Sequence, residues 1–228
     1  MKWDENLRSI IIQKNKFILC VTILCFTFNS WSQTVKKSDA TVKTEYTSEI
    51  TNQENCNWCG TSEAPENVSR STIIPPKGEP GDKLIISGTV YLPDGKTPAK
   101  DIIVYVYHTN IKGGYPKIGN ENGNGKYHGY LRGWMKTDSN GTYEFETIRP
   151  APYHSHGGEP AHIHYNVQGS DYPEYWLTAT WFSDDPRVTD EYKKSVKRSG
   201  GFSNIIILTK DENNVLRGSR NIILEKFE

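Results

Sequence analysis

Short apolar runs separated by turn residues fill the chain from about residue 73 onward. The runs are rich in β-branched and aromatic residues, and Gly, Pro, Asn and Asp lie between them, which is typical of β-strands. The segments that we expect to be strands are 83–93 (KLIISGTVYLP), 102–109 (IIVYVYHT), AHIHYNVQ, YWLTATWF, NIIILTK and NVLRGSRNIILEK. In addition, GYLRGWMKTD and SNGTYEFETI predict a hairpin around Asn140 and Gly141.

One segment favours a helix instead, DPRVTDEYKKSVKR at 185–198. Pro186 suits the first turn of a helix, and the late Lys and Arg residues suit its C-terminal end. The pattern therefore predicts an all-β fold, an antiparallel β-sandwich of about eight strands with one short helix. The sequence has no internal repeat and no glycine-rich nucleotide-binding loop between a strand and a helix.

Residues 1–32 have the pattern of a secretory signal peptide. Basic residues precede the apolar run FILCVTILCFTF at 17–28, and small residues follow at Ser30 and Ser32. The apolar run has about twelve residues, fewer than the roughly 20 that span a bilayer. We therefore expect cleavage after Ser32 and export to the periplasm or the extracellular space, with no membrane partner once the signal peptide is removed.

Residues 33–70 are rich in Thr, Ser, Glu, Lys and Asn, which predicts a flexible or loosely docked segment ahead of a folded domain at 71–228. This segment contains NCNWCG, with Cys56 and Cys59. A CxxC in an exported protein is a local disulfide, half of a metal site or a redox pair. We favour the disulfide, because no histidine follows Cys59 for haem attachment and no second CxxC completes a zinc site.

Charge argues against one class of partner. Lys plus Arg and Asp plus Glu both number 27, so the formal net charge is zero. A chain without an excess of basic residues has no overall field that attracts nucleic acid. We therefore expect no nucleic-acid partner.

Four of the six histidines lie close together, His154 and His156 in PYHSH and His162 and His164 in PAHIHY. Because side chains alternate between the two faces of a strand, His162 and His164 point the same way and Ile163 points the opposite way. Two imidazoles on one face can bind one metal ion, but partly buried, hydrogen-bonded histidines are also common. The HxH pattern alone leaves both interpretations open.

Six segments follow one another between about Gly88 and Pro186: GTVYLPDGKTPAKDIIVYVYHT, GGYP, RGWMKTDSNGTYEFETIRPAPY, PAHIHY, LTATWF and DDP. The first is also typical of a transthyretin-like accessory domain. In this order and spacing the set resembles the intradiol ring-cleavage dioxygenases, non-haem iron(III) enzymes of aromatic compound catabolism that open catechols between the two hydroxyl groups. The resemblance implies an intradiol dioxygenase-like β-sandwich that inserts dioxygen into a catechol-type aromatic and forms a muconate-type diacid.

In this family two tyrosinates and two histidines bind Fe(III). The resemblance implies that the matching ligands are Tyr115 in GGYP, Tyr153 in RPAPY, His162 and His164, and that Tyr153 leaves when the substrate binds. The chemistry of the donors agrees, because iron(III) is a hard Lewis acid that favours anionic oxygen, and coordination lowers the pKa of a phenol.

Other assignments of the tyrosines remain open. Taken singly, Tyr115 fits an aromatic side chain in a Gly-Pro turn, and Tyr153 fits a phenol that anchors a loop. Tyr127 and Tyr130 are near enough in sequence to take the place of Tyr115.

The sequence departs from the family three residues before the first histidine ligand, where Glu159 replaces an arginine. A carboxylate there would repel a catecholate and oppose the electrostatic stabilisation of the reacting substrate. Either another cation, Arg149, Arg132 or a residue of the N-terminal segment, serves an altered substrate, or the protein kept its iron and lost ring cleavage. The catalytic candidates are Tyr153, Glu159 and Arg149.

Two further hypotheses belong to other classes. The chain is a non-catalytic β-sandwich binding module whose histidines are incidental, or a copper or zinc protein that uses His154, His156, His162 and His164 together. The family often assembles into dimers or larger complexes, and the sequence pattern leaves open both the homo-oligomeric state and the identity of the aromatic substrate.

Overall fold

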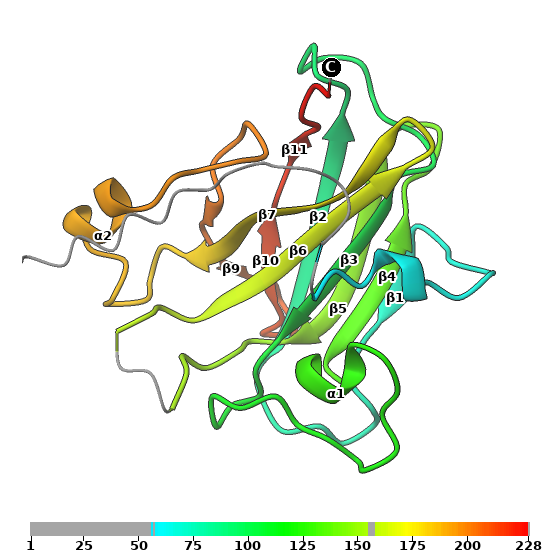
Figure 1. The fold of residues 1–228 in the computed structure, drawn as a ribbon. Coiled ribbons are helices and arrows are strands. Elements are labelled where there is room, and N and C mark those ends of the chain that lie inside the picture. The colour runs from blue at the N-terminus through cyan, green and yellow to red at the C-terminus, as the bar shows by residue number, and fades with distance from the viewer. Residues whose placement is uncertain (1–55, 57, 155–157, 228) are drawn as a thin grey trace, which may run out of the picture. The chain divides into compact units, whose positions relative to one another are not determined.

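The structure of the protein is a computed structural model that describes residue 56 and residues 58–154 and 158–227. Its strands form a six-stranded and a five-stranded sheet, which share one hydrophobic core (Figure 1). The six-stranded sheet contains β1 (Ser71–Ile73), β2 (Lys83–Tyr91), β5 (Thr142–Ile148), β9 (Thr209–Lys210), β10 (Leu216–Ser219) and β11 (Ile222–Ile223). The five-stranded sheet contains β3 (Ile103–His108), β4 (Arg132–Lys136), β6 (His162–Gly169), β7 (Tyr172–Phe182) and β8 (Ile205–Ile206). The helices are α1 (Gly125–His128), α2 (Asp190–Ser195) and the 3₁₀-helix η1 (Thr61–Glu63).

Alternation of buried and exposed residues explains why the six-stranded sheet packs on the other. Every second residue of β2 is buried, and its neighbour β5 alternates in the same way as far as Thr147. Leu84, Ile86 and Phe145 are fully buried in the core. Burial of each such side chain contributes roughly 1.5–3 kcal/mol relative to exposure.

Strand β6 places its alternate residues in two different environments. Ile163, Tyr165 and Val167 are buried in the core between the sheets. Because successive side chains point to opposite faces, His162 and His164 point away from that core, to the outer face of the five-stranded sheet. The predicted common direction of the two histidines follows from the burial of Ile163.

The predicted all-β sandwich is confirmed, but the structure has eleven strands in its described part and its pairing is mixed. The antiparallel pairs are β2–β5, β3–β4, β3–β6, β6–β7 and β9–β10. The parallel pairs are β1–β5, β2–β10, β2–β11 and β7–β8. Each parallel pair includes a strand of only two to four residues. Apolar alternation predicts the long strands, whereas these short ones depend on the sheet edges that they join.

The predicted hairpin around Asn140 and Gly141 is wrong in its pairing. Strand β4 pairs with β3, and β5 pairs with β2 and β1, so the turn joins two different sheets. The turn itself forms as expected, because Gly141 has φ of 71° and Asp138 accepts hydrogen bonds from the backbone N–H groups of Asn140 and Thr142. The strands separate because Met135 and Phe145 both enter the core, from opposite layers.

The helix predicted at 185–198 is shorter in the structure. Helix α2 covers Asp190–Ser195, and the side chain of Thr189 caps it by accepting a hydrogen bond from the N–H of Tyr192 at 3.1 Å. Helix α1 was not predicted, because its four residues are too few to show apolar periodicity.

Residues 58–63, which we name the strap, lie in the segment that we expected to be flexible or loosely docked. Instead Cys59 and Thr61 are 4% and 2% exposed. The strap is held by polar contacts, which include an ion pair of 2.6 Å between Glu63 and Arg132 and a 2.9 Å hydrogen bond from Thr61 to Gln168. The composition correctly indicated a polar segment. The strap is nevertheless docked, because its polar groups pair with residues of the five-stranded sheet. The predicted signal peptide lies outside the described residues, and no helix among the described residues is long and apolar enough to cross a membrane.

His108 joins the two sheets and should make stability depend on pH. It is fully buried, with Nε2 2.6 Å from the hydroxyl of Thr147 and Nδ1 2.8 Å from the carbonyl of Thr109. Burial lowers the pKa of His108 from 6.5 to about 4. The unfolded chain binds this proton at higher pH than the folded one does. The contribution of His108 to the free energy of unfolding is therefore fully present above pH 6.5, and it decreases by about 1.4 kcal/mol per pH unit as the pH falls toward 4.

Urea unfolding of the metal-free protein between pH 4.5 and 7.5 measures this effect. His108→Gln should make the decrease less steep by the contribution of one histidine and leave the contributions of the buried His128 and His164, whereas His154→Gln, which changes an exposed histidine, should leave it as in the wild type. An equally steep decrease in the His108→Gln variant would contradict the assignment.

Candidate metal centre

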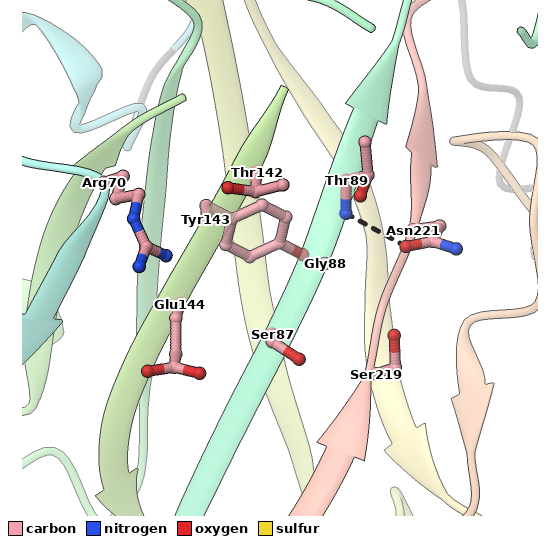
Figure 2. A pocket seen from close by; sticks show the side chains of 9 residues that line it. All are labelled: Arg70, Ser87, Gly88, Thr89, Thr142, Tyr143, Glu144, Ser219 and Asn221. Carbon is pink, nitrogen blue, oxygen red and sulfur yellow. Dashed lines mark hydrogen bonds between the residues drawn. The ribbon is translucent and has the colours of Figure 1, made fainter. Parts of the chain in front are cut away.

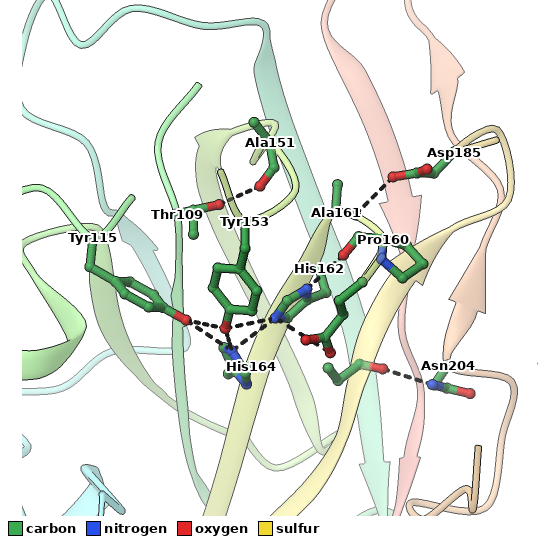
Figure 3. A network of polar contacts seen from close by, with 12 residues as sticks. Thr109, Tyr115, Ala151, Tyr153, Pro160, Ala161, His162, His164, Asp185 and Asn204 are labelled. Atoms are coloured by element: carbon green, nitrogen blue, oxygen red, sulfur yellow. Dashed lines mark hydrogen bonds and ion pairs between the residues drawn. The ribbon is translucent and has the colours of Figure 1, made fainter. Parts of the chain in front are cut away.

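The four residues proposed as ligands meet at one point on the outer face of the five-stranded sheet (Figure 3). The phenol oxygens of Tyr115 and Tyr153 are 2.6 Å apart, and they lie 3.0 and 2.9 Å from Nε2 of His164. Nε2 of His162 lies 3.1 Å from the Tyr153 oxygen and 3.0 Å from Nε2 of His164. We name these four donor atoms the metal centre.

Two loops that are bonded to each other carry the tyrosines. Tyr115 follows β3 and Tyr153 follows β5, and the hydroxyl of Thr109 donates to the carbonyl of Ala151 at 2.6 Å. The backbone of Gly113 has φ of 72° and lies against the backbone of Pro152 and His154, where a Cβ atom would collide. A glycine at this position therefore allows the close approach that brings the two phenols together.

Backbone contacts fix the orientation of His162. Its Nδ1 is 2.7 Å from the carbonyl oxygen of Pro160. Because a carbonyl oxygen can only accept, the neutral imidazole must carry its proton on Nδ1, and the lone pair of Nε2 points to the metal centre. A metal-binding histidine commonly has such a partner on its other nitrogen.

A stack of rings holds His164. Tyr107, its direct partner on β3, stacks on His164 with a centroid distance of 4.5 Å and an interplanar angle of 13°. The other face of Tyr107 stacks on His128 at 3.6 Å, and Nδ1 of His128 is 2.7 Å from the hydroxyl of Tyr105. Burial lowers the pKa of His128 to about 4. The stack thus ends in a neutral, buried imidazole.

The strap covers this stack from outside. Gly60 contacts the ring of Tyr105 and leaves no room for a Cβ atom, and the indole N–H of Trp134 donates to the carbonyl of Gly60 at 2.6 Å. Cys56 and Cys59 form the predicted disulfide next to it. Trp58, 49% exposed, packs on Tyr127 with a centroid distance of 4.1 Å.

The surroundings of the metal centre favour uncharged side chains. Burial raises the pKa of Tyr115 and Tyr153, and the negative charge of Glu159 acts in the same direction on both. Burial lowers the pKa of His164, and His162 adds to this effect. Without a cation at the centre, the protein therefore keeps both phenols protonated.

A bound cation would account for the short distances between the four donor atoms. They make five mutual contacts of 2.6–3.1 Å, but the two phenols and His164 supply at most three protons for them. Metal–ligand bonds of about 2 Å place neighbouring ligand atoms roughly 3 Å apart. Among the described residues no three His, Cys, Asp or Glu side chains are arranged to hold a metal ion, and in this set the tyrosines supply the remaining donors. The donors fit a hard, highly charged ion such as iron(III).

The predicted catalytic side chains other than Tyr153 lie in different surroundings. Oε1 of Glu159 lies 3.9 Å from Nε2 of His162, at the metal centre. Arg149 forms a two-pronged ion pair with Asp184 at 2.6 and 2.7 Å. Arg132 pairs with Glu63 in the strap. The charge of each arginine is therefore balanced by a carboxylate.

The alternative ligands are placed elsewhere by the structure. Tyr130 donates to Glu79 at 2.7 Å, and Tyr127 is 53% exposed against Trp58. Nδ1 of His154 lies 3.0 Å from the carbonyl of Gly113, in the loop that leads to Tyr115. His156 lies outside the described residues.

Sequence reasoning missed Tyr107 and His128, which support His164 from behind. The sequence IIVYVYHT could have indicated Tyr107, because its valines and tyrosines alternate. The valines are buried in the core, so the two tyrosines lie on the opposite face of β3. No pattern indicated His128, because the stack forms between segments distant in the sequence.

Two hollows lie on the described surface. One of about 270 Å³ is on the outer face of the six-stranded sheet and is lined mainly by polar residues of β2, β5 and the C-terminal segment, with Arg70 at its edge (Figure 2). The other, of about 370 Å³, is lined by Gly158, Arg187, Thr189, Glu191, Tyr192 and Ser195. The second one adjoins the loop that carries Glu159, whereas the first lies on the other layer of the sandwich from the metal centre.

Comparisons with known proteins agree in pointing to one family. The sequence model described as "Dioxygenase" matches residues 61–217. Catechol 1,2-dioxygenase 1 of Acinetobacter lwoffii is 32% identical over 142 residues, 56% of this chain and 44% of that protein. The protocatechuate 3,4-dioxygenase beta chain of Burkholderia cepacia is 30% identical over 115 residues, 48% of each. The chain thus spans about half the length of the curated relatives that it matches.

Solved structures show the same fold. Catechol 1,2-dioxygenase from Acinetobacter sp. ADP1, inhibited by bound mercury, superimposes with a TM-score of 0.56 at 24% identity, covering 72% of this chain and 59% of that one. The dioxygenase domain of a dioxygenase carbohydrate-binding protein fusion from Streptomyces sp. SirexAA-E gives 0.53 at 19% identity, covering 72% and 92%.

Phenylalanine substitutions test the metal centre. Ferric ion added to the metal-free protein should produce a visible phenolate-to-iron absorption band, which Tyr115→Phe and Tyr153→Phe should each reduce by roughly half because one of two phenolates is lost. Ferric ion at about 100 times its Kd should also stabilise the wild type by about 2.7 kcal/mol. Tyr130→Phe is the matched control, since Tyr130 bonds to Glu79. An unchanged band in both ligand variants would exclude this set.

Proposed function

The chain belongs to the intradiol dioxygenase family, and we propose that it is an iron(III) enzyme that inserts dioxygen into a catechol-type aromatic ring and forms a muconate-type diacid. The observation that carries this proposal is the meeting of two phenols and two imidazoles, in which each donor atom lies within 3.1 Å of at least two of the others. The names of the relatives support the substrate class, a catechol and dioxygen.

Iron(III) bound at the metal centre would polarise both oxygens of a catechol and withdraw electron density from its ring. Tyr115, Tyr153, His162 and His164 would hold the ion. The Pro160 carbonyl keeps the lone pair of His162 directed inward. The stack behind His164 fixes the plane of the second imidazole. These contacts would keep His162 and His164 in position to hold the ion.

Tyr153 is the residue that we assign to proton transfer. Its loop follows β5, and its phenol oxygen lies within 3.1 Å of the donor atoms of Tyr115, His162 and His164. Burial raises the pKa of the Tyr153 phenol, so a Tyr153 phenolate would be a strong base. It therefore takes the proton of the incoming catechol hydroxyl on its own phenol oxygen.

Aromatic side chains shape one wall of the site. Tyr107 lies 5.6 Å from the ring of Tyr115, and Trp176 lies 6.0 Å from the rings of both Tyr107 and His164. These ring faces exclude water from the side of the metal centre that adjoins β3 and β7.

A metal-binding homologue without ring cleavage is the second candidate function. The observation that favours it is the carboxylate of Glu159 beside His162, together with the pairing of Arg149 and Arg132 to Asp184 and Glu63. In that case the iron centre would form and bind catechols but would not consume dioxygen.

We also propose export of the mature protein, on the basis of the signal-peptide pattern and the cysteine pair. Secretion by the native host followed by N-terminal sequencing should give a mature chain that begins at Gln33. A mature protein that retains residues 1–32 and remains in the cytoplasm would contradict export.

Oxygen consumption tests the proposed reaction. The iron-loaded protein should consume one dioxygen per catechol and form a diacid detected by mass spectrometry as substrate plus two oxygen atoms. His164→Ala should lower kcat/KM at least about 100-fold, because a ligand of the reacting ion is lost. Binding of catechol without oxygen consumption would favour the homologue that lacks ring cleavage.

A further inference from the structure

Glu159 places a negative charge at the edge of the metal centre. Its Oε1 is 3.9 Å from Nε2 of His162, and 42% of its side chain is exposed. In the described part of the chain no lysine or arginine forms an ion pair with it. A molecule that approaches the metal centre from this side therefore meets an unbalanced carboxylate.

The hollow of about 370 Å³ begins at the residue that precedes Glu159 in the chain. Gly158, the neighbour of Glu159 in the chain, lines the hollow, and so does Tyr192 of α2. The ring of Tyr192 packs edge to face on Trp181 at 5.2 Å, and Trp181 is the direct cross-strand partner of His162. The volume is that of a small-ligand site, and it can take a side chain attached to a ring bound at the metal centre.

The charged residues that line this hollow balance each other, since Arg187 and Glu191 have opposite signs. Burial raises the pKa of the Tyr192 phenol in the lining, and the negative charge of Glu159, which lies next to the lining residue Gly158, acts in the same direction. Asp185 is buried nearby and accepts hydrogen bonds from the backbone N–H groups of Ala161 and Arg187. The aromatic face of Tyr192 adds a surface that attracts cations.

We propose that Glu159 is a specificity-determining residue that selects catechols with a positively charged aminoalkyl substituent and discriminates against those with a carboxylate substituent. This inference rests on the proposed function, because it assumes that the catechol oxygens bind at the metal centre. The ammonium group then lies in the hollow, paired with Glu159 and next to Tyr192. A carboxylate substituent in the same place would face Glu159 without a counter-ion, which is discrimination by repulsion.

Three catechols of nearly equal size test the inference: 4-(2-aminoethyl)catechol, 4-ethylcatechol and 3,4-dihydroxyphenylacetate. The Kd of each for the full-length ferric protein is measured without oxygen, from the change in the visible band and by calorimetry. We expect the amine to bind about tenfold more tightly than ethylcatechol and the acid about tenfold more weakly, with both ratios decreasing as salt is added. Glu159→Gln should bring the three constants to within about twofold.

Glu212→Gln is the matched control, since it removes an exposed carboxylate in the turn between β9 and β10, on the other sheet. It should keep the wild-type order. Tight binding of ethylcatechol with equal constants for all three ligands, or an order unchanged by Glu159→Gln, would overturn the inference and leave the proposed function intact. Failure of all three to perturb the ferric protein would overturn the proposed function and the inference with it.

Discussion

The opposite orientation of successive side chains on β6 is the constraint on which the site depends. Ile163, Tyr165 and Val167 fill the core between the sheets. Because side chains alternate along a strand, His162 and His164 must point to the outer face. A shift of one residue in the register of β6 would turn the two imidazoles into the core and turn Ile163, Tyr165 and Val167 to the outer face. The packing that stabilises the fold therefore also positions the imidazole ligands.

The four donor atoms of the metal centre lie closer together than their hydrogen bonds can explain. Burial favours neutral phenols, yet five contacts between four donor atoms are more than their protons can satisfy. A cation removes this conflict, because it turns the phenols into ligands and replaces contacts between lone pairs. Under the proposed function, Tyr153 would be the residue of this centre that takes up a proton from the substrate.

The supporting groups come from several places in the chain. Pro160 orients His162, and Tyr107 and His128 hold His164. The strap lies over Tyr105 at the far end of this stack. Glu159 lies beside His162 instead, next to Gly158 at the hollow near α2. The site thus has an aromatic part that supports His164 and a charged part beside His162, which would meet the rest of the substrate under the proposed function.

The sequence by itself determined the long strands, the sandwich and the common direction of His162 and His164, because alternation is a local property of each strand. Its resemblance to a known family also named Tyr115 and Tyr153, which the structure brings to those histidines. Only the tertiary structure decided that β4 and β5 enter different sheets, that the strap is packed, and that His128 stacks behind the site. These features depend on contacts between residues far apart in the chain, whose energies no local pattern contains.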